Sequence, residues 1–267
     1  MDTLILTLQL FTSLPIKKNV EVSDERLIRG VALWPAAGIV IGLFQALVFC
    51  LADGIFPLQI AAVLALMAEL WMTRGFHLDG LCDTADAVFS SRSRERMLEI
   101  MKDSHIGTFG VVAAVMDLAL KYLLVTASEV PVYMLLAAPV AGKMVQGICM
   151  YRVNYPREKG LGKSYIGRVP AGITVISVAF GALWAGGCLI SADFTFPEAV
   201  VIPVLCGGLA WLFRKHMVKV IGGMTGDTVG AASEITEIFF HAAYGGSGRS
   251  WVRWQFILYV MEKQSVM

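Results

Sequence analysis

The residues of this sequence that are best suited to chemistry form an acidic stripe within Phe76–Asp86. Asp79, Asp83 and Asp86 stand at positions i, i+4 and i+7. On a helix that turns by about 100° per residue, their side chains fall within roughly 60° of one another. Three carboxylates on one stripe repel each other, and a divalent cation between them relieves that repulsion. Oxygen ligands of this kind suit Mg²⁺, which also binds substrate phosphates. The stripe therefore predicts a magnesium site, with a solvated acidic helix face as the alternative.

A second polar cluster, Gly222–Glu234, is rich in glycine and threonine. We predict that Asp227 completes the metal site and acts in catalysis, and that Glu234, seven residues on and on the same helical face, is also catalytic. Backbone N–H groups at a helix start hold phosphate oxygens, so Thr225 and Thr228 are predicted to contact the substrate. The alternative is structural: Thr225 or Asp227 caps the helix, and the glycines allow close helix packing.

Two further polar segments offer positive charge to an anionic substrate. Met97–Gly110 contains Lys102 and His105, which we predict to contact a phosphate. The basic loop Tyr151–Arg168 has three glycines and is able to close over an anion. The alternative for both segments is a role in setting membrane orientation alone.

The elements that position these residues must be membrane helices, because the composition is unlike that of a soluble protein. Of 267 residues, 57% are hydrophobic and 16% are charged, and the mean hydropathy is +0.67. Soluble domains carry about 25% charged residues. A net charge of +1 offers no basic field for nucleic acid. Intrinsic disorder and a disulfide-stapled small domain are excluded as well. We predict an all-α, polytopic bundle of transmembrane helices.

Seven stretches are apolar enough to be spans, which need about 20 residues each. They are Gly30–Ala52, Ile55–Thr73, Ile106–Ala127, Pro131–Met150, Val169–Ala192, Thr195–Phe213 and Thr228–Tyr244. Residues 1–267 are predicted to form a single integral membrane domain. Its N-terminal part, 1–29, is an interfacial segment, and 245–267 is a C-terminal tail that the sequence does not assign.

The charges inside and between the spans add two expectations. Asp117 and Lys121, at i and i+4, should pair, and Glu69 and Lys143 should face the interior of the bundle because charges in lipid are costly. Alternate connections hold 17 basic residues, whereas the opposite connections hold none. The positive-inside rule places the N-terminus and the acidic motifs on the cytoplasmic side of the inner membrane.

Three motifs carry a resemblance to a known family. The segments 77–87, 101–110 and 222–231 resemble the patterns HLDGLADTADG, MKDSRIGxxG and GGxTGDxLGA of the cobalamin synthase, or adenosylcobinamide-GDP ribazoletransferase, family. Their order and spacing also match, from residue 1 to about 244. The departures from the patterns are Cys82 for alanine, Ala87 for glycine, His105 for arginine and Val229 for leucine. Histidine at 105 removes a permanent positive charge.

The resemblance implies an Mg²⁺-dependent integral membrane enzyme with small-molecule substrates. Members of the family transfer the phosphocobinamide moiety of adenosylcobinamide-GDP to α-ribazole or its 5′-phosphate. The products are adenosylcobalamin or its 5′-phosphate and GMP, in the final step of nucleotide loop assembly. The sequence leaves open which acceptor is used and whether the protein is a homo-oligomer.

A mechanistic hypothesis follows from the resemblance and the acidic motifs together. The four aspartates hold Mg²⁺ on the diphosphate while a ribose hydroxyl of α-ribazole attacks the phosphoryl group attached to cobinamide. Glu234 or one of the aspartates accepts the hydroxyl proton, and Lys102 and His105 neutralise phosphate charge. A metal held by carboxylates provides the charge neutralisation that cleavage of a pyrophosphate needs.

Other membrane proteins also use acidic clusters, so two rival functions stand beside this one. A CDP-alcohol phosphotransferase or a prenyltransferase would share the magnesium and the aspartates. The sequence lacks the DG-x2-AR run of the former, because Leu-Cys-Asp follows Asp79-Gly80. A transporter would place its charges near span centres, whereas these acidic motifs lie at span ends.

Overall fold

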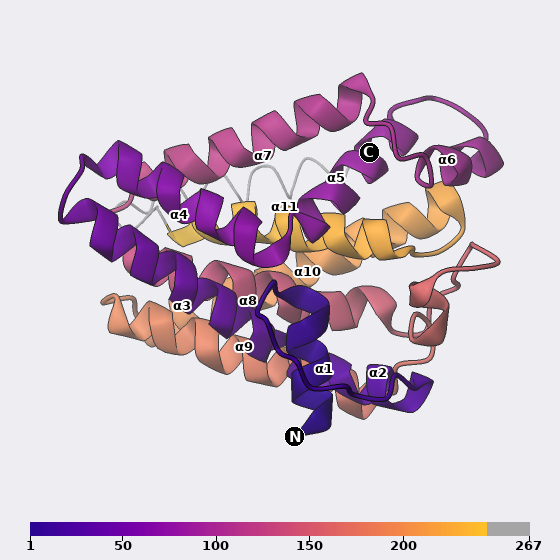
Figure 1. Cartoon of the computed structure of the whole chain (residues 1–267), viewed down its shortest axis with the longest axis horizontal. Helices are drawn as coiled ribbons and strands as arrows, with labels where there is room; N and C mark the ends of the chain where they lie inside the picture. Colours follow the sequence, from indigo (N-terminus) through magenta and orange to yellow (C-terminus); the bar gives the residue numbers. More distant parts are fainter. Residues whose placement is uncertain (245–267) are drawn as a thin grey trace.

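The computed structural model describes residues 1–244 as a helical bundle, and no strand occurs in that part of the chain (Figure 1). The prediction for the tail 245–267 lies outside the described residues. The α-helices are α1 (Asp2–Phe11), α2 (Asp24–Gly30), α3 (Trp34–Asp53), α4 (Leu58–Thr73), α5 (Phe76–Val88), α6 (Arg94–Ile100), α7 (Thr108–Thr126), α8 (Pro131–Met150), α9 (Ala171–Ser191), α10 (Phe196–Ile221) and α11 (Gly226–Tyr244). Two short 3₁₀ helices cover Val31–Leu33 and Leu161–Ser164.

The seven long helices α3, α4 and α7 to α11 overlap the seven predicted spans, and α10 continues to Ile221, beyond the predicted end at Phe213. Five helical stretches are both long and apolar enough to cross a membrane: Asp24–Asp53, Thr108–Thr126, Pro131–Met150, Ala171–Ser191 and Phe196–Ile221. Of the other two helices, α4 is apolar but has only 16 residues, and α11 carries three acidic side chains. The predicted all-α polytopic architecture is confirmed.

The bundle has two inner helices surrounded by helices with apolar outer faces. Most of α8 is buried, and so is most of α11, which runs between α5 and α7 on one side and α8 and α10 on the other (Figure 1). Large apolar side chains are exposed at intervals of three or four residues on the outer helices, as at Leu43, Leu47 and Leu51 of α3. Such a surface suits lipid tails, so polar side chains gather inside the bundle.

A sharp break separates α4 from α5 and directs α5 toward the start of α11. Arg74 and Gly75 both adopt left-handed conformations, with φ of 57° and 64°. This conformation is costly for arginine. The N-terminal segment stabilises the break, because Ser13 N–H donates to the Met72 carbonyl at 2.6 Å and Arg74 donates to the Gln9 carbonyl at 3.3 Å.

The N-terminal helix α1 packs against the bundle through its last turn. Phe11 is 2% exposed, and its ring lies 4.8 Å from the ring of Trp34 and 5.6 Å from that of His77. Leu4, which the period of a helix places on the same face as Phe11, stays 37% exposed. The interfacial position of residues 1–29 stays a prediction, but its apolar face is anchored to the protein at one end.

Candidate functional site

The acidic stripe of α5 meets Asp227 at the start of α11. Gly80 makes this contact possible: a Cβ at this position would lie 2.8 Å from the Asp227 carbonyl oxygen and 3.0 Å from its Cα. The two backbones therefore touch where any side chain would separate them. Asp79 and Asp83, one helical turn apart, flank Gly80 on α5. We call Asp79, Asp83 and Asp227 the aspartate cluster.

The electrostatics of Asp83 reflect the charged groups around it. The pKa of Asp83 is raised to about 7, first by burial and then by the negative charges of Asp79 and Asp227, while Arg157 opposes the shift. Carboxylates that raise one another's pKa in this way favour a bound cation. Three carboxylates from two helices provide the hard oxygen donors that a magnesium ion prefers, so the chemistry of these residues fits the predicted metal. Their oxygens are farther apart than the 4.8 Å within which those of Glu69, Glu234 and Glu237 lie.

Asp227 has a basic partner that the sequence analysis did not single out. Arg157, from the loop between α8 and α9, donates from Nη2 to Asp227 Oδ2 and to the Met101 carbonyl at 3.2 Å. Thr225 Oγ1 lies 3.4 Å from the same Asp227 oxygen. The only signal in the sequence was the concentration of basic residues in this loop.

Asp86, the third residue of the predicted stripe, points to the start of α7. Its carboxylate accepts hydrogen bonds from the backbone N–H groups of Gly107 at 2.7 Å and Gly110 at 2.8 Å. A Cβ at Gly107 or Gly110 would lie within 2.4 Å of this carboxylate. Asp86 thus caps α7, and the spacing of the two glycines reflects that cap. Its role as a metal ligand stays a prediction.

Thr225 and Thr228 form the helix cap of the structural alternative, and their contact with substrate stays a prediction. Thr225 N–H donates to Thr228 Oγ1 at 2.8 Å, and Thr228 N–H donates to Thr225 Oγ1 at 3.2 Å. Both residues are fully buried. Their hydroxyl groups therefore fix the start of α11, and with it the position of Asp227.

Lys102 and His105, the predicted phosphate contacts, lie in the connection between α6 and α7. Both residues are exposed. His105 Nδ1 lies 2.6 Å from Asp103 Oδ1, so its partner is a neighbour in the chain and not a member of the aspartate cluster. The structure leaves their contact with substrate as a prediction.

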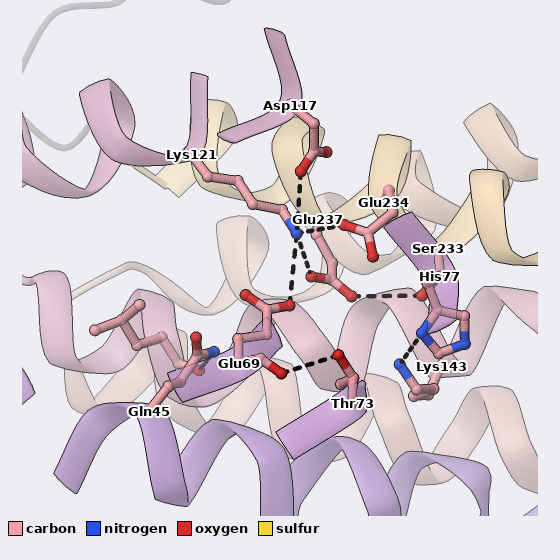
Figure 2. Close-up of polar contacts among 11 residues, drawn as sticks. Gln45, Glu69, Thr73, His77, Asp117, Lys121, Lys143, Ser233, Glu234 and Glu237 are labelled. Atoms are coloured by element: carbon pink, nitrogen blue, oxygen red, sulfur yellow. Dashed lines mark hydrogen bonds and ion pairs between the residues drawn. The ribbon is translucent and has the colours of Figure 1, made fainter. Parts of the chain in front are cut away.

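Glu234 lies in a second cluster, inside the bundle (Figure 2). Lys121 Nζ is surrounded by four carboxylates: Glu234 at 2.5 Å, Glu237 at 3.0 Å, Glu69 at 3.5 Å and Asp117 at 3.7 Å. We call these five residues the buried lysine cluster. The predicted pairing of Asp117 with Lys121 is confirmed, as is the inward orientation of Glu69.

The buried lysine cluster is separate from the aspartate cluster in both composition and environment. Glu69, Glu234 and Glu237 have carboxylate oxygens within 4.8 Å of one another, a spacing that suits a metal, but the Lys121 ammonium bonds to all three. Beside them, Lys143 Nζ lies 3.3 Å from His77 Nδ1, which confirms the inward orientation of Lys143 (Figure 2). The structure thus does not group Glu234 with the aspartates, and its catalytic role stays a prediction.

Residues 3–244 match the cobalamin-5-phosphate synthase family. The chain belongs to this family. All three motifs and both clusters lie within the matched residues, and the resemblance inferred from those motifs is confirmed.

Curated relatives of the chain cover nearly its whole length. The adenosylcobinamide-GDP ribazoletransferase of Clostridium novyi (strain NT) is 37% identical over 250 residues, which are 91% of this chain and 96% of the relative. The protein of the same name from Klebsiella pneumoniae (strain 342) is 36% identical, covering 85% of this chain and 91% of the relative. That of Clostridioides difficile (strain 630) is 33% identical, covering 90% and 95%. No solved structure matches the chain.

Proposed function

We propose that this protein is an adenosylcobinamide-GDP ribazoletransferase. It transfers phosphocobinamide from adenosylcobinamide-GDP to α-ribazole or its 5′-phosphate, and it releases GMP. Membership of the family over residues 3–244 supports this activity. The structural observation that carries the proposal is the backbone contact between Gly80 and Asp227, which brings acidic residues of two separate motifs to one place.

In this proposal, the aspartate cluster holds the magnesium ion. When bound, the metal neutralises charge on the diphosphate that is cleaved. The residues of the chain set the geometry: Gly80 fixes the distance between α5 and α11, and the two threonines fix the start of α11. Asp86 acts indirectly, by holding the first turn of α7 against α5.

The group transfer is a displacement at the phosphorus atom attached to cobinamide. A ribose hydroxyl oxygen of the acceptor forms a bond to that phosphorus, the bond from phosphorus to the oxygen bridging toward guanosine breaks, and GMP leaves. A carboxylate of the aspartate cluster accepts the hydroxyl proton. Glu234 is the less suitable base, because its carboxylate already pairs with Lys121.

The protein is membrane-embedded, and we propose that its aspartate cluster faces the cytoplasm from the inner membrane. Asp227 follows the end of α10, and the connection that carries Arg157 lies beside it. The connections on this side are those that hold the basic residues, which favours a cytoplasmic location.

The test is an assay of the purified protein, reconstituted in liposomes, with adenosylcobinamide-GDP and α-ribazole. We expect equal amounts of corrinoid product and GMP, loss of both with EDTA, and recovery on addition of Mg²⁺. Release of CMP from a CDP-alcohol, or of diphosphate from a prenyl substrate, would favour the rival transferases. Solute flux without any nucleotide product would favour a transporter.

A further inference from the structure

Arg157 is held beside the aspartate cluster by a loop that is fixed at its base. The Met224 N–H donates to the Asn154 carbonyl at 3.0 Å, and the Gly167 N–H donates to the Met150 carbonyl at 2.8 Å. A Cβ at Gly223 would lie 2.1 Å from the same Asn154 oxygen. The loop base is therefore attached to the turn that leads into α11, and Arg157 follows three residues after Asn154.

The guanidinium group of Arg157 is largely enclosed but incompletely bonded. Its side chain is 11% exposed, and Nη2 bonds to Asp227 and to the Met101 carbonyl. Its Nε is buried and has no hydrogen-bond partner among residues 1–244. A buried arginine normally uses its donors fully, so this group retains capacity for another acceptor.

The charges of the site show what Arg157 does before any metal binds. With all three carboxylates ionised, the aspartate cluster carries three negative charges, and Arg157 supplies one positive charge, which leaves a formal charge of −2. One divalent cation would neutralise that remainder. Such a cation would also compete with the guanidinium for the Oδ2 oxygen of Asp227, because both are attracted to the same lone pairs.

We propose that Arg157 is a resident cation that holds Asp227 until the metal arrives and then binds a phosphoryl oxygen of the substrate diphosphate. This inference rests on the proposed function and adds a substrate-binding residue to it. A metal-loaded site is close to neutral and attracts an anionic diphosphate only weakly. Releasing the guanidinium from Asp227 leaves this total unchanged but frees its N–H donors for the substrate, and its planar fork suits bidentate binding of phosphate.

The test separates metal binding from substrate binding in the full-length protein. Binding of Mn²⁺, measured by electron paramagnetic resonance on the purified protein without substrate, reports the metal site alone. The KM for adenosylcobinamide-GDP at saturating Mg²⁺ reports the substrate contact. The variants are Arg157→Ala and Arg157→Lys, and the control is Lys159→Ala, an exposed residue of the same loop.

We expect Arg157→Ala to bind Mn²⁺ about tenfold more tightly, because a competing positive charge is removed. The same variant should have a KM at least about tenfold higher, because a charged phosphate contact is lost. Arg157→Lys should keep Mn²⁺ affinity within about threefold while its KM still rises, since lysine keeps the charge but lacks the fork. Lys159→Ala should change neither quantity.

Weaker or unchanged Mn²⁺ binding in Arg157→Ala would overturn the proposal, and so would an unchanged KM in both Arg157 variants. Arg157→Lys serves as the test where the alanine variant does not fold. The Asp83→Asn variant distinguishes failure of the inference about Arg157 from failure of the proposed function. If Asp83→Asn loses Mn²⁺ binding while Arg157→Ala leaves it unchanged, the metal site stands and only the role of Arg157 is refuted.

Discussion

The two acidic clusters of this protein differ in how their negative charge is balanced. The buried lysine cluster places four carboxylates around one ammonium group, inside the helices, and the surrounding protein excludes solvent. The aspartate cluster places three carboxylates beside one guanidinium, at the end of the bundle, and Asp79 is exposed. The buried lysine cluster has the Lys121 ammonium group at its centre, whereas the aspartate cluster is accessible to a cation from solution.

This difference shows why acidic residues alone do not identify a catalytic site. Glu69, Glu234 and Glu237 have the closer spacing, yet a lysine already bonds to them. The aspartates are less buried and carry a negative charge that the protein does not balance. A divalent ion can balance it, and an anionic substrate can then bind to that ion. The four predictions below test the comparison, from the largest expected effect to the smallest.

Asp79→Asn and Asp83→Asn should each reduce GMP formation by about a thousandfold or more, equivalent to about 4 kcal/mol of transition-state stabilisation. Each variant should still insert and fold. Asp83→Asn should even resist heating better than the unaltered protein at pH 8. Burial raises the pKa of Asp83 from 3.8 to about 7, so the stability of the folded state falls as the pH rises between these values. The whole cost is present at pH 8, and asparagine removes it.

The control for these two variants is Asp103→Asn, an exposed carboxylate that pairs with His105. It should retain normal turnover. Near-normal rates in both Asp79→Asn and Asp83→Asn would show that the aspartate cluster does not hold the catalytic metal.

Lys121→Met should destabilise the folded protein by about 3–5 kcal/mol, because it leaves four buried carboxylates without their cation. The measurement is the fraction of monodisperse protein recovered by size-exclusion chromatography after extraction from membranes. Adding Glu234→Gln to Lys121→Met should recover part of the loss. A Lys121→Met protein that is as stable as the unaltered one would show that the cluster is balanced in another way.

Asp86→Ala should reduce stability by about 0.5–2 kcal/mol, the range typical of a lost helix cap. Asp86→Asn should keep turnover within about tenfold of normal, since an amide oxygen still accepts a backbone hydrogen bond. Thermal unfolding and the GMP assay measure the two effects. If Asp86→Asn were as inactive as Asp83→Asn, Asp86 would be a metal ligand, as the spacing of the acidic stripe predicts.

Lys102→Ala and His105→Ala should change the KM for adenosylcobinamide-GDP by less than about threefold, because exposed charges interact weakly. The measurement is steady-state GMP release over a range of substrate concentrations. A rise of more than about tenfold in either variant would support the phosphate contacts that the sequence predicts.

The sequence was sufficient to predict the helices and part of the site. Apolar stretches and the distribution of basic residues located all seven long helices. The i, i+4 spacing predicted the Asp117–Lys121 pair, and the two motifs predicted that Asp227 joins the stripe. These features depend on local periodicity or on the cost of placing charge in lipid. Both leave a signal in the order of residues within a single segment, so the sequence alone reveals them.

The remaining contacts depend on how helices far apart in the sequence pack. Asp86 and Asp83 lie on the same face of one helix. Asp86 caps α7 only because the first turn of α7 packs beside it in the folded protein. Glu234 lies seven residues after Asp227, so about 10 Å of helix separates them, and the position of Lys121 decides its partner. Arg157 lies in a loop without periodicity, where its partner is set by the anchoring of Asn154.

The position of Lys121 also bears on how the chain is assembled during synthesis. Glu234 and Glu237 belong to α11, the last helix to leave the ribosome among those described, whereas Asp117 is on the same helix as Lys121. Before α11 is synthesised, Asp117 is the carboxylate that can reach Lys121 from within its own helix, and Glu69 of α4 is the other member of the cluster already made. The arrival of α11 then adds Glu234 and Glu237 to the contact with Asp117, so the last of the described helices completes a cluster whose lysine was made more than a hundred residues earlier.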